Sequence, residues 1–336
     1  MHIFELDKTE LAEFFQNKPK YRFDQFLNGV YRNLENDFDK ISTLPKKIKE
    51  ELKYNIETAL PEIVTKQTST DGTTKYLLNL KDDNKIEMVL IPHKEKNTLC
   101  VSSQVGCSRG CEFCATAKLG LKRNLECNEI ISQIFIAMKE LGDARLTNIV
   151  FMGMGEPLDN YDNVVKSVGI LQELFLFSPR KITVSTCGIV PKIELLALAG
   201  LKVKLAVSLN SAIQEKREML MPVAVKYPLD ELKNSLLTFK KKNPFRITFE
   251  YIMMKDLNMG TDDLKALIRF LGDISCKLNL IKWNPVPGLP YKSPTDREIE
   301  SFRNKLMTLD SAVTYRKSKG DDIDAACGQL AGKAEN

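Results

Sequence analysis

Histidine is scarce in this sequence. His2 and His93 are the only two among 336 residues, and the eight cysteines include a single Cys-x₂-Cys pair. Zinc sites usually need two such pairs, or one pair followed by His-x₃-His. The composition therefore disfavours a zinc centre, although three clustered cysteines completed by Cys100 or His93 stay open as one. A disulfide framework is disfavoured too, because the chain is long and shows no secretory signal.

Long apolar runs are absent as well. No stretch approaches the ~20 apolar residues that a membrane helix requires, and the first residues lack the basic and apolar regions of a signal peptide. With 43% hydrophobic and 28% charged residues, the composition is that of a soluble globular protein. The net charge of +5 permits RNA binding without indicating it, and the basic run at 316–319 could meet phosphates. We expect a cytoplasmic protein with no membrane partner.

Three cysteines lie close together in the chain. Cys107, Cys111 and Cys114 form the pattern Cys-x₃-Cys-x₂-Cys. Thiolates are soft ligands that suit iron–sulfur clusters, zinc or copper(I). Three of them can hold three irons of a [4Fe–4S] cube, whose Cys₄ form needs a fourth protein ligand. No fourth cysteine follows at a short interval, so one iron would stay open, as is typical of catalytic metal sites.

The hydrophobic pattern divides the chain into parts. The N-terminal region has apolar residues at helical spacing, and Lys46, Lys47, Lys49 and Lys53 lie off the apolar face of one predicted helix. Two β-like runs, 75–80 and 85–91, flank a turn as a hairpin would. The predicted parts are a helical accessory domain (1–60), a β-hairpin linker (61–92), an α/β core (93–320) and a C-terminal segment (321–336).

Helices and strands alternate after the cysteine cluster. A helix capped by Asn128 is predicted to run to Leu141, and Val- and Ile-rich strands alternating with helices imply a parallel sheet with right-handed crossovers. Six strands are too few for a closed (β/α)₈ barrel. The pattern alone does not separate a partial barrel from a doubly wound sheet. The predicted strands are 148–152, 181–186, 202–208, 246–253, 277–283 and 312–317.

Distinctive polar residues follow several of these strands. In parallel α/β folds, ligands bind at the carboxyl ends of the strands. Four such ends meeting on one face favour a ligand pocket over four unrelated turns. The residues concerned are Gly155, Glu156, Ser185, Ser208, Leu209, Asn210 and Asn284.

The cysteine motif and three further sequence words resemble a known family. Cys-x₃-Cys-x₂-Cys is the cluster motif of radical S-adenosylmethionine (SAM) enzymes. The words Cys-Val-Ser-Ser-Gln-Val-Gly-Cys (100–107), Gly-Met-Gly-Glu-Pro-Leu (153–158) and Asp-Ile-Asp-Ala-Ala-Cys-Gly-Gln-Leu (322–330) are similar to the RlmN/Cfr family of RNA adenine methyltransferases, closer to its RlmN branch. The likeness runs from about Glu87 to Gly332. It implies an α/β fold with a partial (β/α)₆ TIM-like radical SAM barrel.

The resemblance also implies cofactors and their ligands. Cys107, Cys111 and Cys114 would hold a [4Fe–4S] cluster, and SAM would chelate the fourth iron. One departure stands out, because the family usually has Ser-Leu-His where this chain has Ser-Leu-Asn. Asn210 can still donate and accept hydrogen bonds. The implied SAM contacts are Gly155, Glu156, Ser185, Ser208, Leu209, Asn210 and Asn284.

The resemblance assigns chemistry to three more residues. Cys327 would be methylated on sulfur by a first SAM and would carry the new carbon. A second SAM would yield a radical that activates this methyl group for addition to adenine. Glu87 would take the proton from carbon 2, and Cys100 would then attack the Cys327 thioether, leaving a Cys100–Cys327 disulfide. From its own neighbours, Glu87 reads only as the solvent-facing side of a strand.

The family's substrates and partners complete the expectation. They are adenosine 2503 of 23S rRNA, adenosine 37 of some tRNAs and an electron donor such as flavodoxin, and we expect a monomer. One alternative is a Cfr-type enzyme that methylates carbon 8 of the same rRNA adenine. An alternative from another class is a zinc-dependent RNA-binding protein without catalysis.

Overall fold

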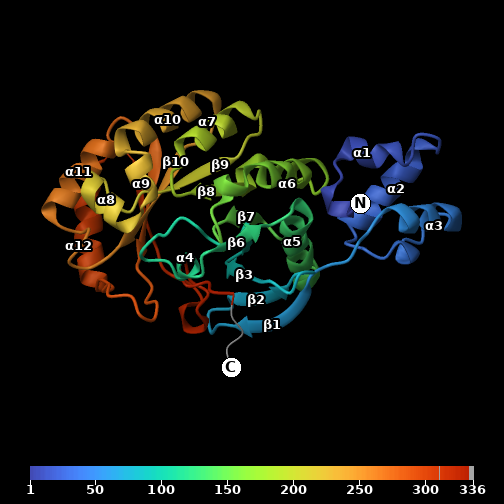
Figure 1. The fold of residues 1–336 in the computed structure, drawn as a ribbon, viewed down its shortest axis with the longest axis horizontal. Helices are drawn as coiled ribbons and strands as arrows, with labels where there is room; N and C mark the ends of the chain where they lie inside the picture. Colours follow the sequence, from blue (N-terminus) through green and yellow to red (C-terminus); the bar gives the residue numbers. More distant parts are fainter. Residues whose placement is uncertain (310, 333–336) are drawn as a thin grey trace.

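The computed structural model describes residues 1–309 and 311–332 and contains a sheet of ten strands. Their order is β1-β2-β3-β4-β7-β8-β9-β10-β11-β12, and a separate pair is formed by β5 and β6. Figure 1 shows the large sheet curving like an open barrel. The strands are β1 (Glu62–Thr68), β2 (Thr74–Asn79), β3 (Lys85–His93), β4 (Lys96–Cys100), β5 (Gln104–Gly106), β6 (Leu121–Asn124), β7 (Asn148–Phe151), β8 (Ile182–Thr186), β9 (Lys204–Ser208), β10 (Ile247–Met253), β11 (Cys276–Lys282) and β12 (Ala312–Arg316).

Helices cover the outer face of the curved sheet. In Figure 1, α5, α6, α7 and α10 arch over one side of it, whereas α4 lies on the concave side with the C-terminal segment. The α-helices are α1 (Lys8–Glu13), α2 (Lys20–Tyr31), α3 (Lys46–Asn55), α4 (Ala115–Lys118), α5 (Cys127–Leu141), α6 (Tyr161–Glu173), α7 (Val190–Leu198), α8 (Gln214–Leu220), α9 (Val223–Lys226), α10 (Leu229–Lys242), α11 (Thr261–Leu271) and α12 (Asp296–Leu306). Among the described residues, no helix has the length and apolar character needed to cross a bilayer.

The parallel part of the sheet confirms the predicted α/β class. All six predicted strands are present as β7 to β12, and each pairs in parallel with its neighbour. β9 and β10 each have three consecutive buried residues at their centres, as is typical of strands in a parallel sheet, whereas Val313 is the one buried residue of β12. The sheet has one more parallel strand than predicted, because β4 pairs in parallel with β7. In the chain, β4 is followed by the short strand β5, and the loop that carries the three clustered cysteines begins directly after β5.

The predicted hairpin is present and extends the sheet. β2 and β3 pair antiparallel, with Leu77 opposite Glu87. β3 then pairs antiparallel with β4. The segment expected to be a linker is therefore hydrogen-bonded to the first parallel strand. Of the predicted C-terminal segment, residues 333–336 lie outside the described residues.

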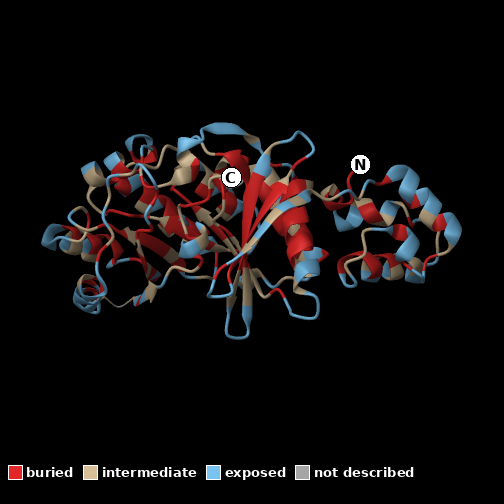
Figure 2. Ribbon diagram, turned by 90° about the horizontal axis from the view of Figure 1, so that it is seen from below, coloured by how far each residue is buried: buried red, intermediate tan, exposed pale blue. Residues whose placement is uncertain are grey.

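The N-terminal helices pack against one end of the α/β layer, beside α5 and α6 in Figure 1. The contact is aromatic: the ring centroids of Phe4 and Phe135 are 5.0 Å apart, and those of Tyr31 and Phe175 are 5.1 Å apart. Figure 2 shows the buried residues concentrated along the sheet and on the inner side of α5. Asn128 was expected to cap α5, but this was wrong: Glu126, two residues earlier, caps the helix and forms a capping box with Glu129.

Candidate active site

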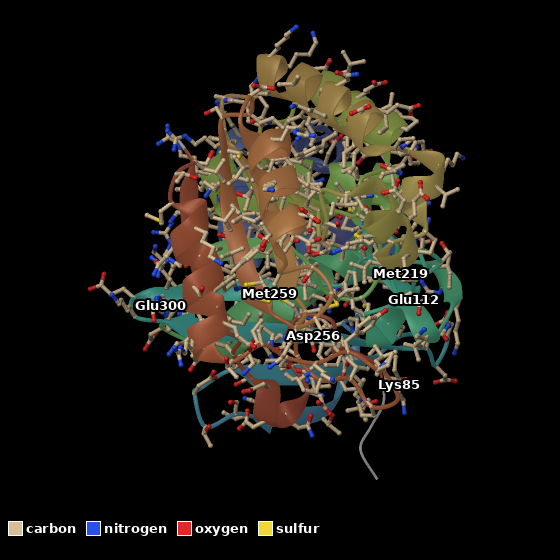
Figure 3. All side chains as sticks on the ribbon, turned by 90° about the vertical axis from the view of Figure 1, so that its left-hand side faces the viewer. Lys85, Glu112, Met219, Asp256, Met259 and Glu300 are labelled. Atoms are coloured by element: carbon tan, nitrogen blue, oxygen red, sulfur yellow. The ribbon has the colours of Figure 1, made fainter. Side chains whose placement is uncertain are left out.

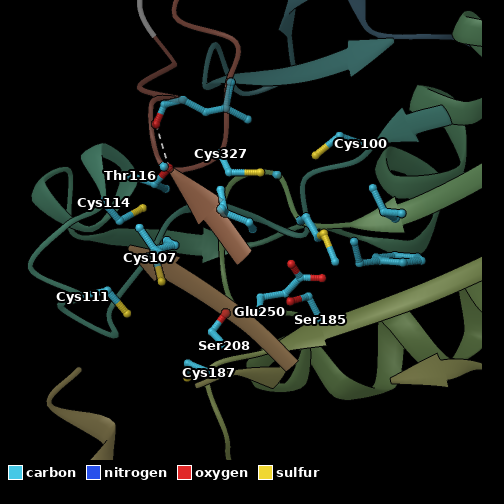
Figure 4. A pocket seen from close by; sticks show the side chains of 18 of the residues that line it. Cys100, Cys107, Cys111, Cys114, Thr116, Ser185, Cys187, Ser208, Glu250 and Cys327 are labelled. Carbon is cyan, nitrogen blue, oxygen red and sulfur yellow. Dashed lines mark hydrogen bonds between the residues drawn. The ribbon is translucent and has the colours of Figure 1, made fainter. Parts of the chain in front are cut away.

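A cavity opens where the parallel strands end. It lies on the concave side of the sheet, between the cysteine loop, the ends of β7 to β12 and the C-terminal segment. Figure 4 shows the three clustered cysteines on one side of it and Cys100 and Cys327 on another. The predicted site residues that line this cavity are Cys100, Cys107, Cys111, Cys114, Gly155, Glu156, Ser185, Ser208 and Cys327.

The cysteine loop is closed at its base by the β5–β6 pair. Gly106 ends β5 with φ +79°, and a Cβ there would meet the carbonyl oxygen of Gly120 at 1.8 Å, so only glycine fits. The Cys107 N–H donates to the same Gly120 oxygen at 2.9 Å. At the other end of the loop, Cys114 caps α4. Figure 3 shows Glu112 of the loop beside Met219 of α8, where the Glu112 N–H donates to the Leu220 carbonyl oxygen at 3.0 Å.

Burial dominates the electrostatics of the three thiols. It raises the pKa of Cys107 to about 12 and raises the pKa values of Cys111 and Cys114 as well. Without a metal, these thiols therefore keep their protons at neutral pH. Because thiolates are the ligands, a bound metal must displace those protons.

The Gly-Met-Gly-Glu word shapes a second wall of the cavity. Gly155 has φ +97°, and a Cβ there would lie 2.5 Å from Cβ of Gln104. Glu156 is 4% exposed. Its Oε2 accepts from the Cys187 N–H at 2.7 Å and its Oε1 from the Leu158 N–H at 3.0 Å. Burial raises the pKa of Glu156, and the hydrogen bonds to these N–H groups oppose that rise.

Three of the predicted SAM contacts do not line the cavity: Leu209, Asn210 and Asn284. Asn210 has φ +56°, a left-handed conformation that asparagine tolerates better than most residues. Its Oδ1 accepts from the Ile252 N–H at 2.9 Å, so the side chain joins the end of β9 to β10. Asn284 donates from Nδ2 to the Cys327 carbonyl oxygen at 3.1 Å.

The two cysteines with expected redox roles lie in the same cavity. Cys100 and Cys327 are free thiols. Burial raises the pKa of Cys100 to about 12, and the nearby Cys327 adds to that rise. The structure thus places both sulfurs at one site although they are far apart in the chain.

Glu87 lies outside the cavity, behind the C-terminal segment. Its strand neighbours predicted that Glu87 faces solvent. This was wrong, because Glu87 is only 2% exposed. Its Oε2 accepts from the N–H groups of Ala331 at 2.8 Å and Gly332 at 2.9 Å. Its Oε1 is 3.3 Å from Nζ of Lys75.

The sequence did not single out three further cavity residues: Arg316, Glu250 and Cys187. Arg316 belongs to the basic run read as a possible phosphate contact. Glu250 has a buried Oε2 with no hydrogen-bond partner among the described residues. Glu250 lies in the middle of β10, so its place in the chain gave no strand-end signal, whereas Arg316 ends β12.

Comparisons with known proteins agree with this geometry. The radical SAM superfamily model matches residues 101–271. The dual-specificity RNA methyltransferase RlmN of Nitratiruptor sp. is 41% identical over 99% of this chain and 98% of its own length. A probable enzyme of the same name from Dictyoglomus turgidum is 40% identical over 98% and 96%. The chain belongs to the RlmN family of radical SAM enzymes.

A solved structure supports the same membership over the whole fold. A radical SAM methyltransferase from Sphaerobacter thermophilus superposes with a TM-score of 0.93 at 38% identity, covering 99% of this chain and all of that one. The chain is therefore a radical SAM methyltransferase. Membership of this superfamily implies SAM and a [4Fe–4S] cluster.

The donor set fits such a cluster. Among the described residues, no three His, Cys, Asp or Glu side chains surround a single metal position. In a cube each cysteine ligates a different iron, so the three thiols need not converge on one point.

A buried cation beside the loop also fits an anionic group. Arg217 is fully buried, and its pKa is lowered by burial, whereas charge on Cys187 and Cys111 would raise it. Its Nη2 donates to the Cys187 and Ser208 carbonyl oxygens, but Nε and Nη1 have no partner among the described residues. A cube held by three thiolates is negatively charged and would compensate this buried cation.

Replacement of Arg217 by methionine should affect iron-loaded protein more than iron-free protein. The guanidinium gains its compensating charge only when the cluster is present, and burying an uncompensated charge is costly. We expect the stability difference between the two forms to shrink by about 1–3 kcal/mol. Anaerobic thermal or denaturant unfolding of both forms measures it, with the exposed Arg269→Met on α11 as control. An equal loss in both forms would contradict the pairing.

Replacement of Arg316 by methionine should slow alkylation of Cys327. The Arg316 guanidinium has no hydrogen-bond or ion-pair partner among the described residues, and charge on Cys327 is the first cause that raises its pKa. A cation beside the sulfur stabilises the negative charge that the sulfur carries as it attacks an alkylating agent. We expect a slower reaction of Cys327 with iodoacetamide, measured by peptide mass spectrometry. The exposed Arg303→Met is the control, and an unchanged Cys327 rate would show that Arg316 does not assist this thiol.

Proposed function

We propose that this protein methylates carbon 2 of adenine in RNA, with adenosine 2503 of 23S rRNA and adenosine 37 of tRNA as its targets. The observation that carries the proposal is the shared cavity of Cys327, Cys100 and the Cys107–Cys114 loop. A methyl carrier, a second thiol and a cluster site are the three parts that such a reaction needs together. The names of the RlmN relatives support RNA as the substrate.

The proposed cofactors are held by residues of the cavity wall. Cys107, Cys111 and Cys114 would hold a [4Fe–4S] cluster, which when bound would supply the electron that cleaves SAM. Gly155, Glu156, Ser185 and Ser208 line the cavity and would contact SAM there. Leu209, Asn210 and Asn284 do not line the cavity and would act on SAM only indirectly; Asn284 donates to the Cys327 carbonyl oxygen.

Cys327 and Cys100 carry the covalent steps. The Cys327 thiol loses its proton to solvent or a neighbouring base and takes a methyl group from a first SAM, which leaves as S-adenosylhomocysteine. Removal of a hydrogen atom from that methyl group leaves an unpaired electron on its carbon, which then bonds to carbon 2 of adenine. The adduct gives its unpaired electron to a one-electron acceptor, such as the oxidised electron donor, and its carbon 2 proton to a base. Cys100 attacks the Cys327 sulfur, the carbon–sulfur bond breaks toward the product, and a Cys100–Cys327 disulfide forms. Two electrons from a reductant return both thiols.

Glu87 is the proposed proton acceptor for the hydrogen on carbon 2. Both of its carboxylate oxygens are engaged, one by the Ala331 and Gly332 N–H groups and one by Lys75. It can reach adenine only after the end of the C-terminal segment moves. The support for this role is the family resemblance of the Ile86-Glu87-Met88 word.

The target base must leave its stack to reach the cavity. Extruding a base costs a few kcal/mol, which contacts to the flipped base offset. The N-terminal helices are a proposed RNA contact through the lysines of α3. Lys49 and Lys53 contact Asp39, and Lys46 lies 3.8 Å from a carboxylate oxygen of Glu50, so Lys47 is the better candidate. We further propose a cytoplasmic monomer that receives electrons from a donor such as flavodoxin.

Anaerobic reconstitution with iron, sulfide, SAM and a reductant tests this function. Unmodified rRNA and tRNA are supplied separately, and nucleoside mass spectrometry scores methyladenosine together with 5′-deoxyadenosine. The proposal predicts 2-methyladenosine from both RNAs. A product of 8-methyladenosine would place the enzyme in the Cfr-type branch. A colourless protein with stoichiometric zinc and no product would instead support a non-catalytic RNA-binding module.

A further inference from the structure

The end of the chain around Cys327 is held at several points. We call residues 325–332 the carrier loop. The Ala115 N–H donates to the Gly328 carbonyl oxygen at 2.7 Å, and Thr116 Oγ1 donates to the Leu330 carbonyl oxygen at 2.7 Å (Figure 4). Both donors directly follow Cys114. The carrier loop is therefore hydrogen-bonded to the same short helix that begins at the cysteine cluster.

The last contact of the carrier loop is with Glu87. Two successive N–H groups, those of Ala331 and Gly332, converge on one carboxylate oxygen at 2.8 and 2.9 Å. Successive backbone N–H groups arranged in this way form an anion-binding nest. Gly332 has φ +62°, and a Cβ there would meet the Lys85 carbonyl oxygen at 3.2 Å. The turn is thus shaped to fit closely against β3.

Lys75 holds the other side of this carboxylate. Leu77 is opposite Glu87 in the β2–β3 ladder, so Lys75 is a diagonal neighbour of Glu87 on the same face. The side chains are 7% and 2% exposed, and their N···O distance is 3.3 Å. A buried carboxylate with a cationic neighbour and two N–H donors makes strong, charge-assisted hydrogen bonds. Removing it leaves Lys75 and both N–H groups without their partner.

We propose that Glu87 is a positioning residue that anchors the carrier loop and so places the Cys327 thiol in the cavity before RNA binds. Glu87 does not line the cavity, so it acts on Cys327 through the loop. This inference rests on the proposed function for the role of Cys327. Anchoring the loop is a second role for Glu87, and it precedes the proton transfer proposed above. The carboxylate can accept a proton from adenine only after the N–H groups of Ala331 and Gly332 have left it.

The order of the two tasks gives a clear test. A proton acceptor acts only after carbon 2 of adenine has been attacked, whereas a positioning residue already acts when Cys327 takes its methyl group without RNA. Glu87→Ala removes the acceptor of both N–H groups. Glu87→Gln keeps an oxygen at that position but is not a base. The matched control is Glu57→Ala, which removes an exposed carboxylate paired with Lys81.

Two readouts are made on RNA-free protein. Hydrogen exchange of the peptide covering the carrier loop is followed by mass spectrometry in cluster-free protein, and Cys327 S-methylation is followed in reconstituted protein with SAM. For Glu87→Ala we expect at least tenfold faster exchange and at least tenfold slower methylation. For Glu87→Gln, whose single oxygen can still accept from both N–H groups but leaves Lys75 without its partner, we expect both rates to lie between those of the parent and Glu87→Ala, with RNA product still lost. Wild-type exchange and methylation in Glu87→Ala would overturn the proposal and leave Glu87 as a base alone.

A second variant approaches the same contact from the loop. Ala331→Pro removes one of the two N–H donors and leaves the sheet unchanged. Like Glu87→Ala, Ala331→Pro should make hydrogen exchange of the carrier loop faster and Cys327 methylation slower. It therefore tests the contact even if Glu87→Ala folds poorly. No change in either readout would also overturn the anchor. Because exchange needs neither cluster nor RNA, failure of the anchor is distinguishable from a wild-type enzyme that fails to methylate RNA.

Discussion

Replacement of Cys327 by alanine is expected to abolish methyl transfer to RNA while the iron content of the protein stays unchanged. The thiol is the only proposed acceptor for the first methyl group, and loss of a covalent nucleophile typically costs ~10³-fold or more in rate. Nucleoside mass spectrometry after anaerobic turnover measures the product, and iron and sulfide assays measure the cluster.

Cys276→Ala is the matched control for this variant. Cys276 is a free thiol like Cys327, but it is buried at the start of β11 and does not line the cavity, whereas Cys327 is partly exposed. We expect it to retain the parent activity within about twofold, as for a small change at a buried site. Full activity in Cys327→Ala would show that this thiol is not needed, and would contradict the proposed transfer of the methyl carbon through Cys327.

Replacement of Cys111 by alanine is expected to lose both the cluster and all turnover. Three thiolates are the fewest that hold a cube with one open iron, so two cannot retain it. The reconstituted parent should contain about four irons and four sulfides per chain and absorb in the visible range. The variant should contain less than about one iron and should form no 5′-deoxyadenosine.

Cys187→Ala tests whether position in the motif is what matters. Cys187 lines the same cavity, and burial raises its pKa well above the ordinary value. It lies outside the Cys-x₃-Cys-x₂-Cys pattern, so its removal should leave the iron-to-protein ratio unchanged. Equal iron loss in Cys111→Ala and Cys187→Ala would contradict the assignment of the three ligands.

The α/β core could be predicted because each of its strands buries apolar side chains, with β9 and β10 buried on both faces at their centres. Such strands read as short Val- and Ile-rich runs, and β7 to β12 all match predicted segments. β4 was not counted among them, because Lys96-Asn97-Thr98 at its start is polar and only Leu99 and Cys100 are buried. The sequence also did not predict that the hairpin joins the sheet. The pairing of β3 with β4 produces no hydrophobic periodicity in either strand that would indicate its partner.

Residues of the cavity were predictable where they lay at the carboxyl end of a strand and carried a distinctive side chain. Ser185 and Ser208 satisfied both conditions, and the structure brings them into the cavity with the cysteines. Glu87 satisfied neither. Its burial comes from Ala331 and Gly332, which are more than 240 residues away in the chain. No local pattern predicts a contact over that separation.

Asn210 shows a different limit of sequence reasoning. Its substitution for the family's usual histidine raised the question of how its side chain reaches SAM. In the structure the side chain bonds to the Ile252 N–H and lies in a left-handed turn. Its donor and acceptor atoms were evident from the sequence, but the direction in which they point depends on the local backbone conformation.

The origin of the transferred carbon tests the central claim most directly. Reconstituted protein is first incubated with SAM labelled with ¹³C in its methyl group, and excess SAM is removed. RNA and unlabelled SAM are then added for a single turnover. If Cys327 carries the carbon, the first product contains ¹³C, and the ¹³C-methyl group disappears from the Cys327 peptide at the same rate. An unlabelled first product, with the label still on Cys327, would contradict the account.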